Sequence, residues 1–125
     1  MTATVYLNTP NLPTDLLFDS EWFLQAADVI PVWKDYTGAG ISIGIFDPSG
    51  NVDFSNPDLA PNAGQSIKID GTPGVETIGT HATLVAGVIG AANNGQGGIG
   101  VAYGATISSE AIPMGPVISI TSKIW

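Results

Sequence analysis

The sequence predicts an α/β fold built around a parallel sheet, and three segments carry this prediction. Residues 41–46, ISIGIF, form a short, mostly apolar run between glycine and proline turns, which is typical of a buried strand. Residues 81–92 are small or aliphatic after an opening histidine, which predicts a helix buried on every side. Residues 105–108, ATIS, fit a second strand. In this order the segments predict a strand–helix–strand crossover, the connection that parallel strands require.

Composition excludes several classes of function. The 125 residues allow one domain with a real core. The formal net charge of −8 argues against nucleic acid and anionic membranes as partners. The sequence has no cysteine, which excludes disulfides and thiolate metal sites. Its most apolar run is too short to span a bilayer, and its first ten residues lack the pattern of a signal peptide. Residues 95–100 satisfy the dinucleotide pattern G-x-G-x-x-G, but they follow a helix instead of opening one, so no nucleotide site is expected.

The segment before the first strand predicts an arm and two short helices. Residues 1–15 are polar and punctuated by proline, so an extended arm is expected. Ser20 can cap an amphipathic helix over residues 21–29, and Pro31 suits the first turn of a second helix. The large aromatic side chains here are interpreted as packing residues: Trp22, Phe23 and Trp33.

Asp47 follows the first predicted strand. In open α/β sheets, ligands and catalytic groups gather beyond the carboxyl ends of the strands, so Asp47 is a candidate functional residue. From the residues alone, an aspartate that forms a turn with Pro48-Ser49-Gly50 is an equally open interpretation. Residues 51–79 are expected to form a long polar loop region.

The only histidine, His81, opens the apolar helix. Thr80 can act as the N-cap, and Asn93-Asn94-Gly95 can end the helix. In the first turn, the positive end of the helix dipole favours the neutral imidazole that a general base requires. A structural histidine that hydrogen-bonds within a core is the alternative. Gly87 and Gly90 lower helix stability, which indicates close packing against neighbouring backbone.

Several ordered motifs resemble those of the subtilisin-like serine proteases. Residues 36–47, YTGAGISIGIFD, resemble the stretch around the catalytic aspartate of that family, and residues 81–87, HATLVAG, resemble its histidine motif H-G-T-H-V-A-G. NPDL at 56–59 resembles H-P-D-L, and residues 91–107 resemble the segment after the histidine helix. The resemblance covers residues 16–107 and includes secreted bacterial members with kexin-like features.

This resemblance implies a partial three-layer α/β sandwich with a parallel sheet, a truncated form of the subtilisin-like fold. It implies a serine endopeptidase acting on polypeptides, outside the cell. Asp47 would fix the tautomer of His81 through one ring nitrogen, and the other nitrogen would take the proton from a serine hydroxyl that attacks a peptide carbonyl.

The sequence also departs from the family pattern. Ala82 and Leu84 replace a glycine and a second histidine, and the turn after Asp47 is longer by one residue. The nucleophile motif G-T-S-x-A-x-P and the asparagine of the oxyanion hole are absent. The serines of the final segment lack that motif: Ser108, Ser109, Ser119 and Ser122.

Residues 1–125 are therefore expected to be the N-terminal portion of a subtilisin-like peptidase domain, inactive by itself, with an atypical tail at 108–125. The alternative is a non-catalytic remnant that keeps the architecture and acts through binding. An incomplete sheet would have an unpaired edge, through which the chain could associate with itself.

The resemblance further implies a structural calcium ion, because many members bind one between the aspartate of H-P-D-L and the loop after the histidine helix. Asp58 matches that aspartate, and residues 92–98 match the loop in length, with Asn94 at the side-chain ligand position. Calcium accepts backbone carbonyls readily. No N-terminal ligand can be identified from the sequence, and a plain helix-to-strand connection is the alternative.

Overall fold

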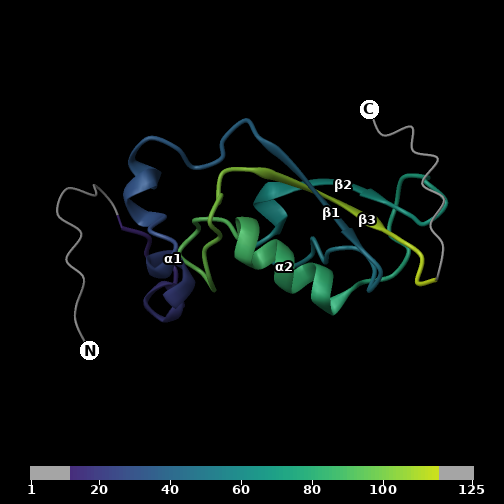
Figure 1. Ribbon diagram of the computed structural model, residues 1–125, viewed down its shortest axis with the longest axis horizontal. Helices are drawn as coiled ribbons and strands as arrows, with labels where there is room; N and C mark the ends of the chain where they lie inside the picture. The colour runs from purple at the N-terminus through teal and green to yellow at the C-terminus, as the bar shows by residue number, and fades with distance from the viewer. Residues whose placement is uncertain (1–11, 116–125) are drawn as a thin grey trace.

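The computed structural model describes residues 12–115. It contains a three-stranded parallel sheet in the order β1-β3-β2, in which β1 is Ser42–Asp47, β2 is Ala63–Ile67 and β3 is Thr106–Ala111 (Figure 1). The predicted α/β class with a parallel sheet is confirmed. Most of the predicted arm and tail, with Ser119 and Ser122, lies outside the described residues.

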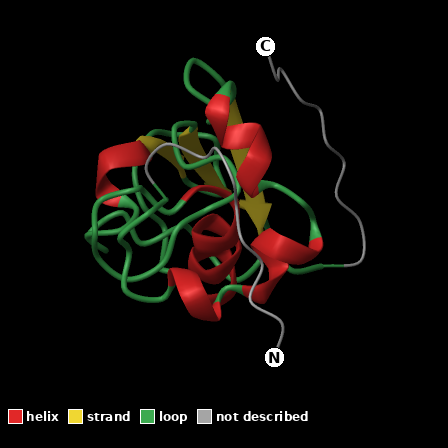
Figure 2. Ribbon diagram, turned by 90° about the vertical axis from the view of Figure 1, so that its left-hand side faces the viewer, coloured by secondary structure: helices red, strands yellow, loops and turns green. Residues whose placement is uncertain are grey.

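The two predicted strands form the pair β1 and β3, in register from Ser42 opposite Thr106 to Asp47 opposite Ala111. Asp47 is the last residue of β1 instead of the residue after it. Strand β2 corrects the expectation that residues 51–79 are loop only. Its sequence, AGQSI, contains one β-branched residue, so its local preference for a strand is weak. The segment forms a strand because it pairs with β3. Figure 2 shows how much of the remaining chain is loop.

Helix α2, at Thr80–Gly90, lies along one face of the sheet. Its buried residues are small, Ala82, Ala86 and Gly90, so the helix approaches the sheet closely. The core between helix and sheet is aliphatic and contains Ile45, Val52, Leu59 and Ile107.

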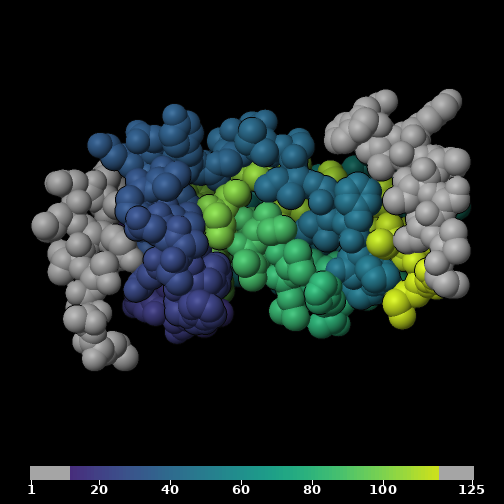
Figure 3. Space-filling model, viewed as in Figure 1, coloured from purple at the N-terminus to yellow at the C-terminus, as the bar shows by residue number. Residues whose placement is uncertain are grey.

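The prediction that this helix is buried on every side is wrong for the described part of the chain. Leu84 is 66% exposed and Val88 is 49% exposed, and Figure 3 shows α2 in green at the molecular surface. The physical reason is that an apolar composition buries a face only where another layer covers it, and residues 12–115 supply one layer, the sheet.

The ends of α2 also differ from expectation. Gly79, not Thr80, is the N-cap, and the helix ends at Gly90, before the asparagine pair. A Cβ at Gly90 would lie 2.8 Å from Cδ1 of Ile107. The backbone of Gly100 also lies so close that a Cβ there would overlap the backbone of Gly90, so the predicted close approach of neighbouring backbone is confirmed at Gly90. A Cβ at Gly87 would meet nothing within 4 Å among the described residues, so close packing does not explain that glycine.

The N-terminal helices form a second core at one end of the molecule (Figure 1). Helix α1, Trp22–Ala26, has no side-chain cap from Ser20, and the predicted second helix is a 3₁₀ helix at Ile30–Lys34. The interpretation of Trp22 as a packing residue is wrong, because it is 75% exposed. This core contains Leu24, Ile30 and Ile99, with Phe18, Phe23, Trp33 and Tyr103 packed around them. No helix within residues 12–115 is long and apolar enough to cross a bilayer.

Strand β1 lies at the end of the strand order, so its outer edge has no partner strand among the described residues. Phe46 on this strand is 51% exposed. At the opposite edge, a turn beside β2 bonds back to it, with the N–H of Gly74 donating to the carbonyl of Ser66 at 2.9 Å. Self-association through the β1 edge stays a prediction, which sedimentation velocity over a range of chain concentrations tests.

Candidate active site

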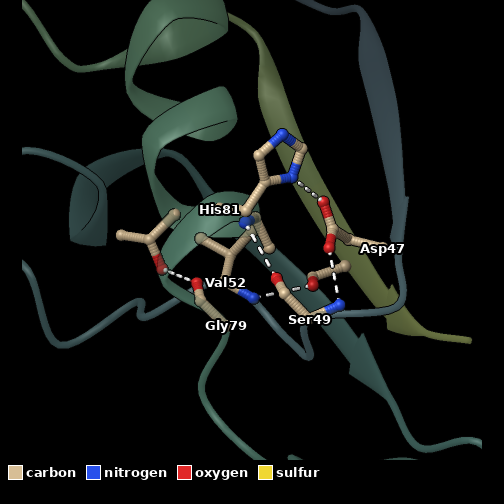
Figure 4. Close-up of polar contacts among 8 residues, drawn as sticks. Asp47, Ser49, Val52, Gly79 and His81 are labelled. Atoms are coloured by element: carbon tan, nitrogen blue, oxygen red, sulfur yellow. Dashed lines mark hydrogen bonds and ion pairs between the residues drawn. The ribbon is translucent and has the colours of Figure 1, made fainter. Parts of the chain in front are cut away.

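The carboxylate of Asp47 and the imidazole of His81 lie in contact at the carboxyl end of β1 (Figure 4). Asp47 is 5% exposed, while the side chain of His81, the second residue of α2, is 71% exposed. Nδ1 of His81 lies 2.5 Å from Oδ2 of Asp47. Strand and helix therefore bring together two residues that are 34 positions apart in the sequence.

The second carboxylate oxygen of Asp47 is also engaged. Its Oδ1 accepts a hydrogen bond from the backbone N–H of Ser49 at 2.7 Å. Hydrogen bonding by the Ser49 side chain, and to a smaller extent by its N–H and by His81, holds the pKa of Asp47 below its usual value, against the opposing effect of burial. Asp47 is therefore ionised at neutral pH. In that state it can accept a proton from Nδ1 of His81, an arrangement that leaves Nε2 available as a base.

The turn after Asp47, formed by Pro48-Ser49-Gly50, folds back on the start of α2. The N–H of Gly50 donates to the carbonyl of Asp47 at 3.3 Å, and Gly50 has a φ of +125°, which favours glycine. Oγ of Ser49 accepts a hydrogen bond from the N–H of Ala82 at 3.3 Å. The longer turn thus leaves Asp47 within hydrogen-bond reach of His81.

The second ring nitrogen of His81, Nε2, is directed away from Asp47 (Figure 4). A general base must present this nitrogen to the proton that it takes. The two serines of β3 have other roles: Ser109 is 1% exposed, and the Oγ atoms of Ser109 and Ser108 accept backbone N–H groups at 2.8 and 3.1 Å. Within residues 12–115, no serine hydroxyl is hydrogen-bonded to the ring of His81.

The candidate metal residues lie in a second place, where Asp58 meets the loop at 92–98. The carbonyl of Asp58 accepts the N–H of Ala92 at 2.7 Å, and its Oδ2 accepts the N–H of Gly98 at 3.0 Å. Nδ2 of Asn94 donates to the carbonyl of the residue before Asp58 at 3.2 Å. The structure therefore brings Asp58 and Asn94 into one neighbourhood.

Asp15 joins this neighbourhood from the N-terminal segment. Its Oδ1 accepts the N–H groups of Asn94 and Gly95 at 3.1 and 3.2 Å. Oδ2 of Asp15 and Oδ1 of Asp58 are buried with no hydrogen-bond partner within residues 12–115. A buried carboxylate oxygen is costly unless a donor or a cation satisfies it. Sequence reasoning missed Asp15, because these contacts span 79 and 80 positions and no local pattern marks them.

Glu21 adds a third carboxylate beside the loop. Its two oxygens accept the N–H of Ile99 at 3.2 and 3.1 Å. Burial raises the pKa of Glu21, the Ile99 N–H opposes this, and Asp15 and Asp58 raise it further. In the described part of the chain, no three acidic or imidazole side chains are grouped closely enough to hold a metal ion by themselves. A cation here would need carbonyl oxygens from the loop, which calcium accepts.

Comparison with known proteins gives consistent matches. The model of the subtilase family, peptidase S8, matches residues 38–119. Furin from Bos taurus is 36% identical over 121 residues, which cover 84% of this chain and 15% of furin. The PC3-like endoprotease variant B from Hydra vulgaris is 37% identical over 117 residues, which cover 77% of this chain and 16% of that protein. The chain thus spans less than a fifth of the length of these curated relatives.

Two solved structures share the fold. Fervidolysin from Fervidobacterium pennivorans, a keratinolytic enzyme related to subtilisin, matches with a TM-score of 0.67 and 28% identity over 78% of this chain and 15% of its own. A protease from Pseudoalteromonas arctica matches with a TM-score of 0.67 and 24% identity over 81% of this chain and 39% of its own.

Proposed function

Because the chain belongs to the subtilase family, a family of serine endopeptidases, we propose that Asp47 and His81 are the acid–base pair of a polypeptide-cleaving site. The single observation that carries this proposal is the contact of 2.5 Å between His81 Nδ1 and Asp47 Oδ2. The exposed ring of His81 and the buried, ionised carboxylate of Asp47 also suit these roles.

In the proposed mechanism, Asp47 holds the proton of His81 on Nδ1 and keeps Nε2 basic. Nε2 takes the proton of a serine hydroxyl as that oxygen attacks the peptide carbonyl, and Asp47 stabilises the imidazolium that forms. The same imidazolium then gives its proton to the leaving amine, and a water molecule repeats the sequence to release the acyl group. Within residues 12–115 the ring of His81 is hydrogen-bonded to Asp47 and to no serine, so the proposal assigns neither the nucleophile nor the oxyanion donor to a residue of this part of the chain.

The ring tautomer of His81 tests the pairing directly. In the parent chain, ¹⁵N NMR at neutral pH is expected to report the proton on Nδ1, and Asp47→Asn is expected to move it largely to Nε2. Asp53→Asn removes a carboxylate that, within residues 12–115, is hydrogen-bonded only to Ser55 of its own turn, and it is expected to leave the tautomer unchanged. An identical His81 tautomer in the parent and in Asp47→Asn would contradict the pairing.

A non-catalytic binding remnant is the competing function. The reading frame beyond the codon for residue 125 separates the two. A nucleophile motif there supports the endopeptidase, and an intact stop codon followed by undamaged sequence supports the remnant.

By family resemblance we also propose an extracellular location. Recovery of the protein in cell pellets and never in the medium would contradict this proposal.

We further propose that the loop at 92–98 and the carboxylates of Asp15 and Asp58 hold a structural calcium ion, with Asn94 beside them. Two buried carboxylate oxygens, which have no hydrogen-bond partner within residues 12–115, support this proposal. The pKa of Glu21 is raised mainly by burial and to a smaller extent by Asp15 and Asp58, so the carboxylates also lie close enough to repel one another. When bound, the ion would tie the N-terminal segment to the end of α2.

Calcium titration measured by calorimetry tests the site. The parent is expected to bind, Asp58→Ala is expected to lose binding, and Asp70→Ala, which removes an exposed aspartate bonded to Thr72, is expected to bind as the parent does. At a hundredfold excess over Kd, calcium is expected to raise the free energy of unfolding by about 2.7 kcal/mol. No heat in the parent, or equal binding in the parent and Asp58→Ala, would rule the site out.

The effect of calcium is also expected to depend on pH through Glu21. Since its pKa is raised in the folded state, its contribution to stability is present below the ordinary value of 4.5 and is lost as pH rises through the raised value. Burial is the larger cause of that loss, and repulsion from Asp15 and Asp58 is a smaller one. A bound calcium ion favours the ionised carboxylates and so offsets the part that is due to repulsion. The stabilisation by calcium is therefore expected to be larger at pH 7 than at pH 4, as urea unfolding measures.

A further inference from the structure

Helix α2 begins without a cap of its own. Its N-cap is Gly79, which has no side chain to accept the free N–H groups of the first turn. A capping side chain normally accepts the N–H of the second or third helical residue. Here Oγ of Ser49 accepts the N–H of the third residue, Ala82, at 3.3 Å. The cap of α2 is thus supplied by a residue 33 positions earlier in the chain.

The same serine is also hydrogen-bonded to Asp47. The N–H of Ser49 donates to Oδ1 of Asp47 at 2.7 Å, on the oxygen that His81 does not use. Ser49 therefore contacts the carboxylate at the end of β1 and the first turn of α2, in which His81 stands (Figure 4).

Two glycines make this arrangement possible. A Cβ at Gly79 would overlap Oγ of Ser49 and lie 2.9 Å from the nitrogen of Gly50, so a capping side chain at position 79 would displace Ser49. A Cβ at Gly50 would lie 2.5 Å from the carbonyl oxygen of Thr77, and the φ of Gly50 is +125°. The backbone of the turn after β1 and the backbone at the start of α2 thus pack so closely that neither Gly50 nor Gly79 has room for a side chain.

We propose that Ser49 is a positioning residue for Asp47 and His81: it caps α2 from the turn that follows the aspartate and so fixes helix and strand relative to each other. This inference rests on the proposed function only in that Asp47 and His81 are the pair to be positioned. The turn after Asp47 places the serine hydroxyl within hydrogen-bond reach of the N–H of Ala82. A catalytic pair tolerates little displacement, because a shift of about 1 Å can cost on the order of a hundredfold in rate.

The test compares Ser49→Ala with a hydroxyl deletion that touches neither functional residue. Oγ1 of Thr83 donates to the carbonyl of Gly79 at 2.8 Å and accepts the N–H of Asp53 at 3.0 Å, so Thr83→Val disturbs the same helix turn without contacting Asp47. The readout is the exchange rate with solvent of the His81 Nδ1 proton, measured by NMR below the unfolding midpoint of each variant.

Both variants are expected to lower the midpoint of urea unfolding. Only Ser49→Ala is expected to raise the Nδ1 proton exchange rate, by roughly tenfold, and Ser49→Thr, which keeps the hydroxyl, is expected to restore the parent rate. Asp47→Asn is measured in parallel and is expected to abolish the protected signal. Equal rates in the parent and Ser49→Ala, with Asp47→Asn changed, would overturn the role of Ser49 and leave the pairing intact. An unchanged Nδ1 proton exchange rate in Asp47→Asn would refute the proposed function itself. If Thr83→Val raised the exchange rate as much as Ser49→Ala does, Ser49 would only stabilise the helix and would have no separate positioning role.

Discussion

The 125-residue chain, assayed by itself, is expected to show no peptide hydrolysis that a serine-directed inhibitor abolishes. Asp47 and His81 can hold and move a proton, but residues 12–115 place no serine hydroxyl at Nε2 of His81. In a member of this family, loss of the serine costs on the order of a millionfold in kcat. Water and an imidazole alone therefore leave a rate below that of a protease.

A fluorogenic peptide or casein assay with long incubation measures this. The parent chain and His81→Ala are expected to give the same background, and an active subtilase at equal concentration is the positive control. Turnover that both the inhibitor and His81→Ala abolish would contradict the prediction and would require a nucleophile among the residues of this chain.

The substitution Gly100→Ala is expected to destabilise the fold by about 3 kcal/mol. A Cβ at Gly100 would overlap the backbone nitrogen and Cα of Gly90, at the end of α2. The same segment closes the helix, since the N–H of Gly100 donates to the carbonyl of Ala91 at 2.9 Å and that of Val101 to Val88 at 3.0 Å. A side chain here forces the segment away and leaves those carbonyls without donors, so urea unfolding should show a lower midpoint.

Gly87→Ala is the matched control and is expected to act in the opposite direction. A Cβ there would meet nothing within 4 Å in the described structure, and alanine is favoured over glycine within a helix by about 1 kcal/mol. The free energy of unfolding should therefore rise. Equal losses in both variants would show that the response reflects helix α2 in general and not the close approach of Gly100 to Gly90.

Local patterns in the sequence determined the parts of this protein that rest on neighbouring residues. The apolar run ISIGIF supplies all of β1 except its last residue, and the uncharged segment after His81 supplies most of α2. The order of these elements places Asp47 and His81 at one end of the sheet. These features were predictable because strand and helix preferences act over a few residues, and because a parallel crossover brings strand ends and helix starts together.

Tertiary structure decided the features that depend on contacts distant in sequence. Strand β2 exists because β3 pairs with it, Asp15 reaches the loop beside Asp58 across about eighty positions, and Ser49 caps a helix to which it does not belong. The exposure of Leu84 likewise depends on which layer covers α2, not on its apolar sequence. The physical reason is common to all four. Hydrogen bonds and apolar burial stabilise any groups that the folded chain brings into contact, however far apart they are in the sequence, whereas a sequence pattern reports only on residues that are near one another in the chain.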